Sequence, residues 1–221
     1  MPPAVTVLQL DTGFPRVPGD VGCPETYRGR VEIIRIPNAT VGQIVTADPA
    51  SIPMAPFEAA LERARGDVVV TSCGFLSYWQ DHLAARTPKP FVSSALMALP
   101  ELCQSYAPHS ILTLTFDADA LTAAHLRGCS TDVIGLPQAM PLRQVISQNY
   151  KTLDTDRAGQ DIAAYVADQK KPWHRCLLLE CTNLPPYKQA IRRVCDLPIV
   201  DILTCIEDIR PGTVRAAFMN P

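Results

Sequence analysis

TSCGFL at residues 71–76 and LECTNLPPY at residues 179–187 each follow a short apolar run and place a cysteine where that run ends. A short apolar run bounded by turn residues is typical of a buried strand. In both copies a proline stands 17 residues after the cysteine and precedes a short β-branched run. The two stretches therefore belong to one pattern that the chain presents twice.

A second pair of segments supports this duplication. LQLD at residues 8–11 matches LTFD at residues 114–117 with a shift of 106 positions, and Cys73 matches Cys181 with a shift of 108. Apolar runs that alternate with helical patterns are typical of parallel α/β sheets. We therefore expect two similar Rossmann-like α/β lobes related by a pseudo-twofold axis, with an active-site cleft between them. The expected boundaries are 1–108 with 206–221 for the first lobe and 109–205 for the second.

The hydrophobic runs also predict individual elements. Strands are expected at residues 4–10, 31–36, 67–71, 91–92, 110–116, 176–180 and 197–200, and helices near 56–65, 119–127, 139–149 and 156–169. A further helix is expected after each of the two cysteines.

The composition excludes several classes of protein. Of 221 residues, 47% are hydrophobic and the net charge is −2, which argues against a disordered chain and a basic nucleic-acid-binding face. No apolar run approaches the roughly 18 residues of a membrane helix, and the N-terminus lacks the basic start of a secretion signal. The expectation is a cytoplasmic protein that binds neither nucleic acid nor membrane.

The cysteine and histidine spacing predicts no metal site. Eight cysteines are present without a Cys-x-x-Cys pair, and the four histidines stand far apart in the sequence. No glycine fingerprint for a dinucleotide and no phosphate-binding loop is present either. We therefore expect reduced thiols and a reaction without cofactors.

The ends of the strands suggest the chemistry. Ligands of parallel α/β sheets gather at the carboxyl ends of the strands, where each copy carries an aspartate (Asp11, Asp117) and a cysteine (Cys73, Cys181). Free N–H groups at the start of a helix stabilise a thiolate, and both cysteines stand at expected strand-to-helix turns. Two thiols on opposite sides of one carbon would suit a two-base exchange of configuration.

These segments, together with LDTGFPRVPGD at residues 10–20, resemble the aspartate/glutamate/hydantoin racemase superfamily, in particular an uncharacterised aspartate/glutamate racemase-like branch. The resemblance implies two lobes, no pyridoxal phosphate, no metal and often a homodimer. It also implies that Cys73 and Cys181 are the catalytic pair and that Asp11 positions or tunes the first cysteine. Thr12, Thr115, Thr182 and Asn183 match positions near the substrate carboxylate.

Two departures from the superfamily pattern concern the substrate. The first cysteine is followed by Gly74 and Phe75 where the amino-acid racemases commonly carry Asn-Thr, and no histidine follows Cys181. Substrates other than glutamate and aspartate are therefore expected, with backbone donors at Gly74 and an aromatic contact at Phe75. Arg16 is a candidate clamp for a second carboxylate, with a solvated side chain as the alternative, and Cys23, which follows a glycine-rich loop, is a further candidate for the cleft.

The predicted function is a cofactor-independent racemase or epimerase acting at a carbon alpha to the carboxylate of an amino acid or related small acid. One alternative is a cis–trans isomerase of an unsaturated diacid, resembling maleate isomerases, that works by thiolate addition. Another is a two-lobed protein that binds a small molecule. The superfamily also contains arylmalonate decarboxylases with one of the two cysteines, so the presence of both favours racemisation or isomerisation.

Overall fold

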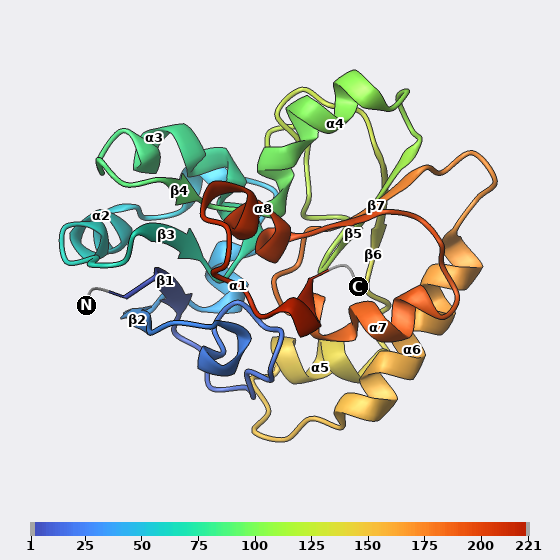
Figure 1. The fold of residues 1–221 in the computed structure, drawn as a ribbon, viewed down its shortest axis with the longest axis horizontal. Coiled ribbons are helices and arrows are strands. Elements are labelled where there is room, and N and C mark those ends of the chain that lie inside the picture. The colour runs from blue at the N-terminus through green and yellow to red at the C-terminus, as the bar shows by residue number, and fades with distance from the viewer. Residues whose placement is uncertain (1–2, 220–221) are drawn as a thin grey trace.

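The computed structural model describes residues 3–219 and contains two parallel sheets of four strands each. The first sheet has the order β2-β1-β3-β4 and the second the order β6-β5-β7-β8 (Figure 1). The strands are β1 (Val5–Leu10), β2 (Val31–Ile36), β3 (Val68–Thr71), β4 (Phe91–Val92), β5 (Ile111–Thr115), β6 (Asp132–Gly135), β7 (Cys176–Leu179) and β8 (Ile199–Val200). Because the same order recurs, the prediction of two similar α/β lobes is confirmed.

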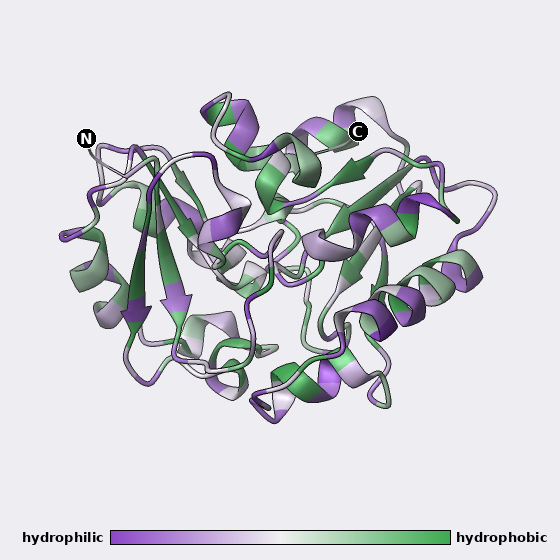
Figure 2. Cartoon of the chain, turned by 60° about the horizontal axis from the view of Figure 1, so that its bottom comes forward, coloured by the Kyte–Doolittle hydropathy of each residue, from purple (hydrophilic) through white to green (hydrophobic). Residues whose placement is uncertain are grey.

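The central strands are the most buried parts of the chain. Every residue of β1, β3, β5 and β7 is buried, and Figure 2 shows these strands as largely hydrophobic. Helices cover both faces of a parallel sheet, so its central strands meet no water and carry continuous apolar runs. This burial explains why the sequences of these four strands are predominantly apolar.

Short helices connect the strands. They are α1 (Val41–Ile44), α2 (Ala55–Leu61), α3 (Gln80–Ala84), α4 (Leu99–Ser105), α5 (Pro141–Ser147), α6 (Thr155–Gln169), α7 (Lys188–Arg192) and α8 (Ile202–Ile209). The long α6 begins where the Asp154 side chain accepts a hydrogen bond from the Arg157 backbone, which satisfies one of the free N–H groups of its first turn. Each cysteine turn continues into a 3-10 helix, Gly74–Trp79 in the first lobe and Pro185–Tyr187 in the second.

In the second lobe one local prediction was wrong and one strand was not predicted. Residues 119–127 form turns instead of a helix, because the His125 ring accepts the Thr122 backbone N–H and Arg127 takes a positive φ of 52°. Residues 132–135, for which no strand was predicted, form the edge strand β6. Its residues are all half-buried, so they lack the apolar run that marks the central strands.

The chain returns to the first lobe at its end. Ile202, Leu203 and Ile206 of α8 share a buried cluster with Val5 and Val70 of the first sheet. The Asp201 side chain caps this helix by accepting from the backbones of its first turn. The lobe boundary expected between residues 205 and 206 falls inside α8.

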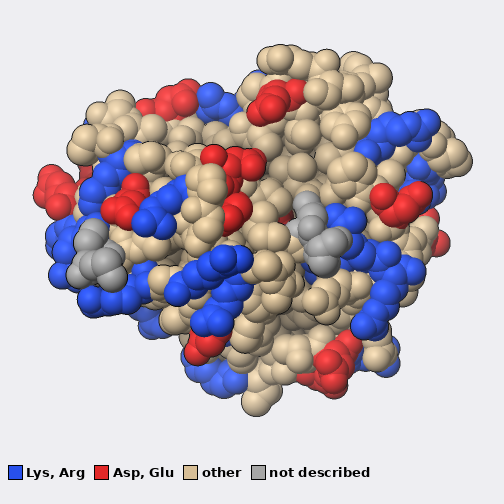
Figure 3. Space-filling model, viewed as in Figure 1, with Lys and Arg blue, Asp and Glu red and all other residues tan. Residues whose placement is uncertain are grey.

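The exterior carries charges of both signs. In the face shown in Figure 3, Lys and Arg side chains are interspersed with Asp and Glu. Within residues 3–219, no helix is both long enough and apolar enough to span a membrane.

Candidate active site

A pocket between the two lobes is lined by strand ends, by the loops that follow the strands and by residues of α1 and α5. The pocket is small, with a volume of about 30 Å³. The lining residues come from both halves of the chain. They are Leu10, Phe14, Arg16, Val41, Val45, Ser72, Cys73, Gly74, Phe75, Phe116, Ile146, Glu180, Cys181, Thr182 and Asn183.

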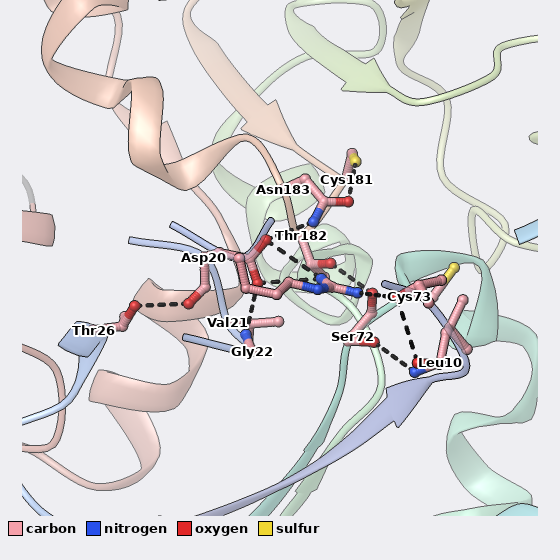
Figure 4. Close-up of polar contacts among 12 residues, drawn as sticks. Leu10, Asp20, Val21, Gly22, Thr26, Ser72, Cys73, Cys181, Thr182 and Asn183 are labelled. Carbon is pink, nitrogen blue, oxygen red and sulfur yellow. Dashed lines mark hydrogen bonds and ion pairs between the residues drawn. The ribbon is translucent and has the colours of Figure 1, made fainter. Parts of the chain in front are cut away.

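The two cysteines enter this pocket from equivalent loops. Cys73 follows β3 and Cys181 follows β7 (Figure 4). Their exposed fractions are 9% and 6%. The two loops contact each other directly, since the Thr182 hydroxyl donates to the Ser72 carbonyl oxygen over 2.8 Å. The Ser72 hydroxyl in turn accepts the Leu10 backbone N–H at 3.0 Å. These bonds hold both cysteine turns against the end of β1.

Burial keeps both thiols protonated in this state. Burial raises the pKa of Cys73 to about 12, the negative charge of Glu180 adds to the rise, and a Phe75 backbone hydrogen bond and the Arg16 charge oppose it. Burial also raises the pKa of Cys181 well above its ordinary value, again with a contribution from Glu180. The Cys181 thiol donates to the Asn183 side-chain oxygen over 3.7 Å. Thiolate chemistry therefore requires a group that accepts the thiol proton.

A buried polar network holds the one arginine of the lining. Arg16 donates to both carboxylate oxygens of Asp20, at 3.2 and 3.3 Å, and to the Thr12 hydroxyl at 3.1 Å. The Asn183 amide donates to Asp20 over 2.5 Å, which ties the arginine to the second cysteine loop (Figure 4). The Arg16 Nε is buried and has no hydrogen-bond acceptor among residues 3–219. The guanidinium thus keeps one unused donor.

Glu180 is an acidic group of the site that sequence reasoning missed. It is 1% exposed and lies between β7 and Cys181. Burial raises its pKa to about 7, although hydrogen bonds from Thr115 and the Phe116 backbone oppose that rise. The available signal was an acidic residue at the end of the apolar run 176–179, where the strand pattern predicts burial.

A family model supports the relationship that the fold suggests. The model described as Asp/Glu/Hydantoin racemase matches residues 20–206. The chain belongs to this family. Its fold resembles glutamate racemase RacE1 from Bacillus anthracis, with a TM-score of 0.55 at 11% identity over 96% of this chain and 84% of that one. It also resembles unliganded arylmalonate decarboxylase, with a TM-score of 0.53 at 14% identity over 96% and 97%.

Curated relatives of this racemase-family chain are named as lyases and not as racemases. Dimethylsulfoniopropionate lyase 7 and lyase 5 of Emiliania huxleyi (strain CCMP1516) are 30% and 29% identical over 91% and 96% of this chain. The chain spans 64% and 45% of the length of these two relatives. A dimethylsulfoniopropionate lyase of Durusdinium sp. clade D is 26% identical over 94% of this chain and 74% of that protein.

The structure brings most of the expected site residues of this family member together. Both cysteines line the pocket, and so do five of the expected substrate-binding residues: Arg16, Gly74, Phe75, Thr182 and Asn183. Thr12 and Thr115 lie behind the lining, where Thr12 supports Arg16 and Thr115 donates to Glu180. Their roles in binding and catalysis stay predictions.

Other candidates lie away from the pocket lining. Asp11 pairs with Arg35 at 3.4 Å and accepts the Asn38 backbone N–H at 3.3 Å. Asp117 is held by Arg143 over 2.6 Å. The buried Cys23 thiol donates to Glu25 over 3.0 Å. The lining instead includes apolar residues of loops and of the helices α1 and α5 that sequence reasoning missed: Phe14, Val41, Val45, Phe116 and Ile146.

The described part of the chain, residues 3–219, contains no group of three or more His, Cys, Asp or Glu side chains that could hold a metal ion. The cysteines of this part are all free thiols. The expected homodimer and the cytoplasmic location stay predictions.

Proposed function

We propose that the chain is an enzyme that removes a proton from the carbon alpha to the carboxylate of a small acid. The observation that carries this proposal is that two thiols from equivalent loops of the two lobes line one pocket together with Arg16. In the proposed reaction Cys73, as thiolate, takes the proton, and the fixed groups of the pocket stabilise the carbanion without a cofactor.

Arg16 is the proposed anchor for the substrate carboxylate. Its side chain is 10% exposed, and Asp20 and Thr12 hold the guanidinium in place. Because the Nε has no acceptor, a carboxylate that enters the pocket would complete its hydrogen bonding. The guanidinium also stacks on the Phe14 ring, with its central carbon 4.4 Å from the ring centroid. The anchor is therefore positioned before substrate arrives.

The proposed outcome is elimination of a β-substituent, with dimethylsulfoniopropionate as the substrate. Relatives that match over 91–96% of this chain carry the name dimethylsulfoniopropionate lyase. The rings of Phe14, Phe75 and Phe116 offer an apolar aromatic wall suited to a methylated sulfonium. Cys73 would take the α-proton, the Cα–Cβ double bond would form, and the C–S bond would break. The products are acrylate, dimethyl sulfide and one proton.

Racemisation is the second candidate, and Cys181 is the observation that favours it. A thiol on the second loop could return a proton to the opposite face of the carbanion when no β-substituent can leave. The same first step would then end in inverted configuration, as predicted from the sequence.

One experiment distinguishes elimination from racemisation with the same protein preparation. The purified chain is incubated in D₂O with dimethylsulfoniopropionate, and separately with chiral 2-substituted small acids. Dimethyl sulfide is measured by headspace gas chromatography and α-deuterium by NMR. We expect dimethyl sulfide and acrylate in equal amounts. Inversion with α-deuterium would favour the racemase, and neither product nor exchange in any sample would contradict the proposal.

Arg16→Lys tests the carboxylate anchor. The lysine keeps a positive charge beside Asp20 but replaces the planar fork by one ammonium group, which cannot reproduce the paired geometry. We expect KM to rise about 10- to 100-fold, the range for loss of a hydrogen bond to a charged group, with a smaller change in kcat. Arg63→Lys, at an exposed arginine outside the pocket, is the matched control. An unchanged KM in Arg16→Lys would assign carboxylate binding to other groups.

A further inference from the structure

We propose that Glu180 is a third proton-carrying group of the site, which accepts the thiol proton of Cys73 and so generates the thiolate. This inference rests on the proposed function and assigns the proton acceptor that function requires. Glu180 belongs to the second lobe, yet its side chain packs against Gly74, the residue that follows Cys73. A Cβ atom on Gly74 would lie 2.0 Å from the Glu180 Oε1. The carboxyl group therefore lies at the turn that carries Cys73.

One oxygen of this carboxyl group has no donor. Oε2 accepts the Thr115 hydroxyl at 2.7 Å, whereas Oε1 is buried and meets no hydrogen-bond donor among residues 3–219. An ionised carboxylate oxygen that is buried without a donor is costly, and protonation lowers that cost because it removes the charge. The positive charge of Arg16 is engaged by Asp20 and Thr12. Glu180 is thus a suitable proton acceptor, because protonation would reduce the cost of burying its carboxylate.

The transfer removes part of the repulsion that opposes ionisation of Cys73. The negative charge of Glu180 helps to raise the pKa values of both Cys73 and Cys181. When the S–H bond of Cys73 breaks and an O–H bond forms at Glu180, that repulsion disappears. The pocket holds one negative charge before and after the transfer, so no further charge is buried. The thiolate can then take the α-proton, and Glu180 keeps the first proton until the pocket opens.

The surroundings favour Cys73 over Cys181 as the donor of this proton. A backbone hydrogen bond stabilises each thiolate, from Phe75 at Cys73 and from Asn183 at Cys181, but the Arg16 charge stabilises the thiolate of Cys73 in addition. The Cys181 thiol instead donates to Asn183, and the negative charge of Asp20 disfavours its ionisation. Cys73 is therefore arranged as the base and Cys181 as the proton donor.

The role of Glu180 as proton acceptor predicts how turnover depends on pH on the acidic side of the profile, called here the acid limb. Glu180 accepts a hydrogen bond from Thr115, and its charge acts on Cys73 and Cys181, while Arg16 lines the same pocket. Burial raises the pKa of Glu180 itself to about 7. Because Glu180 must be ionised to accept a proton, turnover is expected to rise as the pH increases through about 7. Thr115→Val removes a hydrogen bond that stabilises the ionised form, so it should move this limb to higher pH.

Glu180→Gln is the direct test, with two readouts measured on the whole chain. Turnover should fall about 100-fold or more, the range for loss of a group in proton transfer, and the acid limb should vanish. Alkylation of Cys73 by iodoacetamide is measured at pH 8 by mass spectrometry of its peptide. It should become faster, because loss of the negative charge of Glu180 lowers the pKa of Cys73. A merely structural role would lower turnover without removing the acid limb. Circular dichroism and the melting temperature check the fold.

The outcomes separate this inference from the proposed function. If Glu180→Gln keeps full turnover with an unchanged acid limb, or if Cys73 alkylation is not faster, the inference is overturned while the function stands. If the unaltered chain acts on no substrate tested, the function fails, and the alkylation rates still decide whether Glu180 controls Cys73. If Glu180→Gln does not fold, Thr115→Val decides, since an unshifted pH dependence of turnover and alkylation would overturn the inference.

Discussion

Cys73→Ala is expected to lower turnover about 1000-fold, within the range for removal of a general base. The alanine leaves the pocket without a group that can take the α-proton, since Cys181 is held as a hydrogen-bonded thiol by Asn183. Dimethyl sulfide release and α-deuterium incorporation should fall together, because both follow the same proton abstraction. Initial rates from gas chromatography and NMR measure the two effects.

Cys181→Ala and Cys103→Ala complete this comparison. If elimination is the reaction, Cys181→Ala should lose less activity than Cys73→Ala, since the leaving group needs no second proton. If racemisation is the reaction, both variants should lose inversion alike. Cys103, a half-buried thiol of α4 outside the pocket lining, is the control that should keep full rates. Full turnover by Cys73→Ala would end the assignment of the base.

Gly74→Ala has the second large expected effect, on turnover and on stability together. The added methyl group would lie 2.0 Å from Glu180 Oε1 and 2.6 Å from the Glu180 backbone oxygen. A side chain alone could move away, but the backbone contact forces the loop of Cys181 to shift. Overpacking of this kind costs about 1–3 kcal/mol of unfolding free energy. The melting temperature and the turnover should both fall, the latter about 100-fold if the thiols lose their positions.

Gly42→Ala is the matched control for this substitution. A Cβ atom at Gly42 meets nothing within 4 Å, so stability and turnover should stay close to those of the unaltered chain. Thermal unfolding and product formation measured on both variants make the comparison. Normal stability and turnover of Gly74→Ala would contradict the close contact between Gly74 and Glu180.

The duplication of the fold could be predicted because its signals are local. Buried strands such as β3 and β7 are continuous apolar runs, and each is followed by a cysteine turn. Predictions failed where structure depends on neighbours. The edge strand β6 is half-buried and carries no such run, and residues 119–127 form turns through contacts of the His125 ring. There the local bond between the Thr122 backbone and the His125 ring, together with a hydrogen bond from the Ser77 hydroxyl to the His125 carbonyl oxygen, replaces the helical pattern.

The site divides in the same way. That Cys73 and Cys181 occupy equivalent turns followed from the sequence, because strand ends in a parallel sheet share one edge. That Asp11 is directed to Arg35, and that Glu180 reaches Gly74 of the other lobe, depends on how the two lobes pack together. Apolar periodicity along one chain specifies strands and their ends. The distance between side chains of different lobes, and thus the partner of a buried charge, is decided by packing that no local pattern encodes.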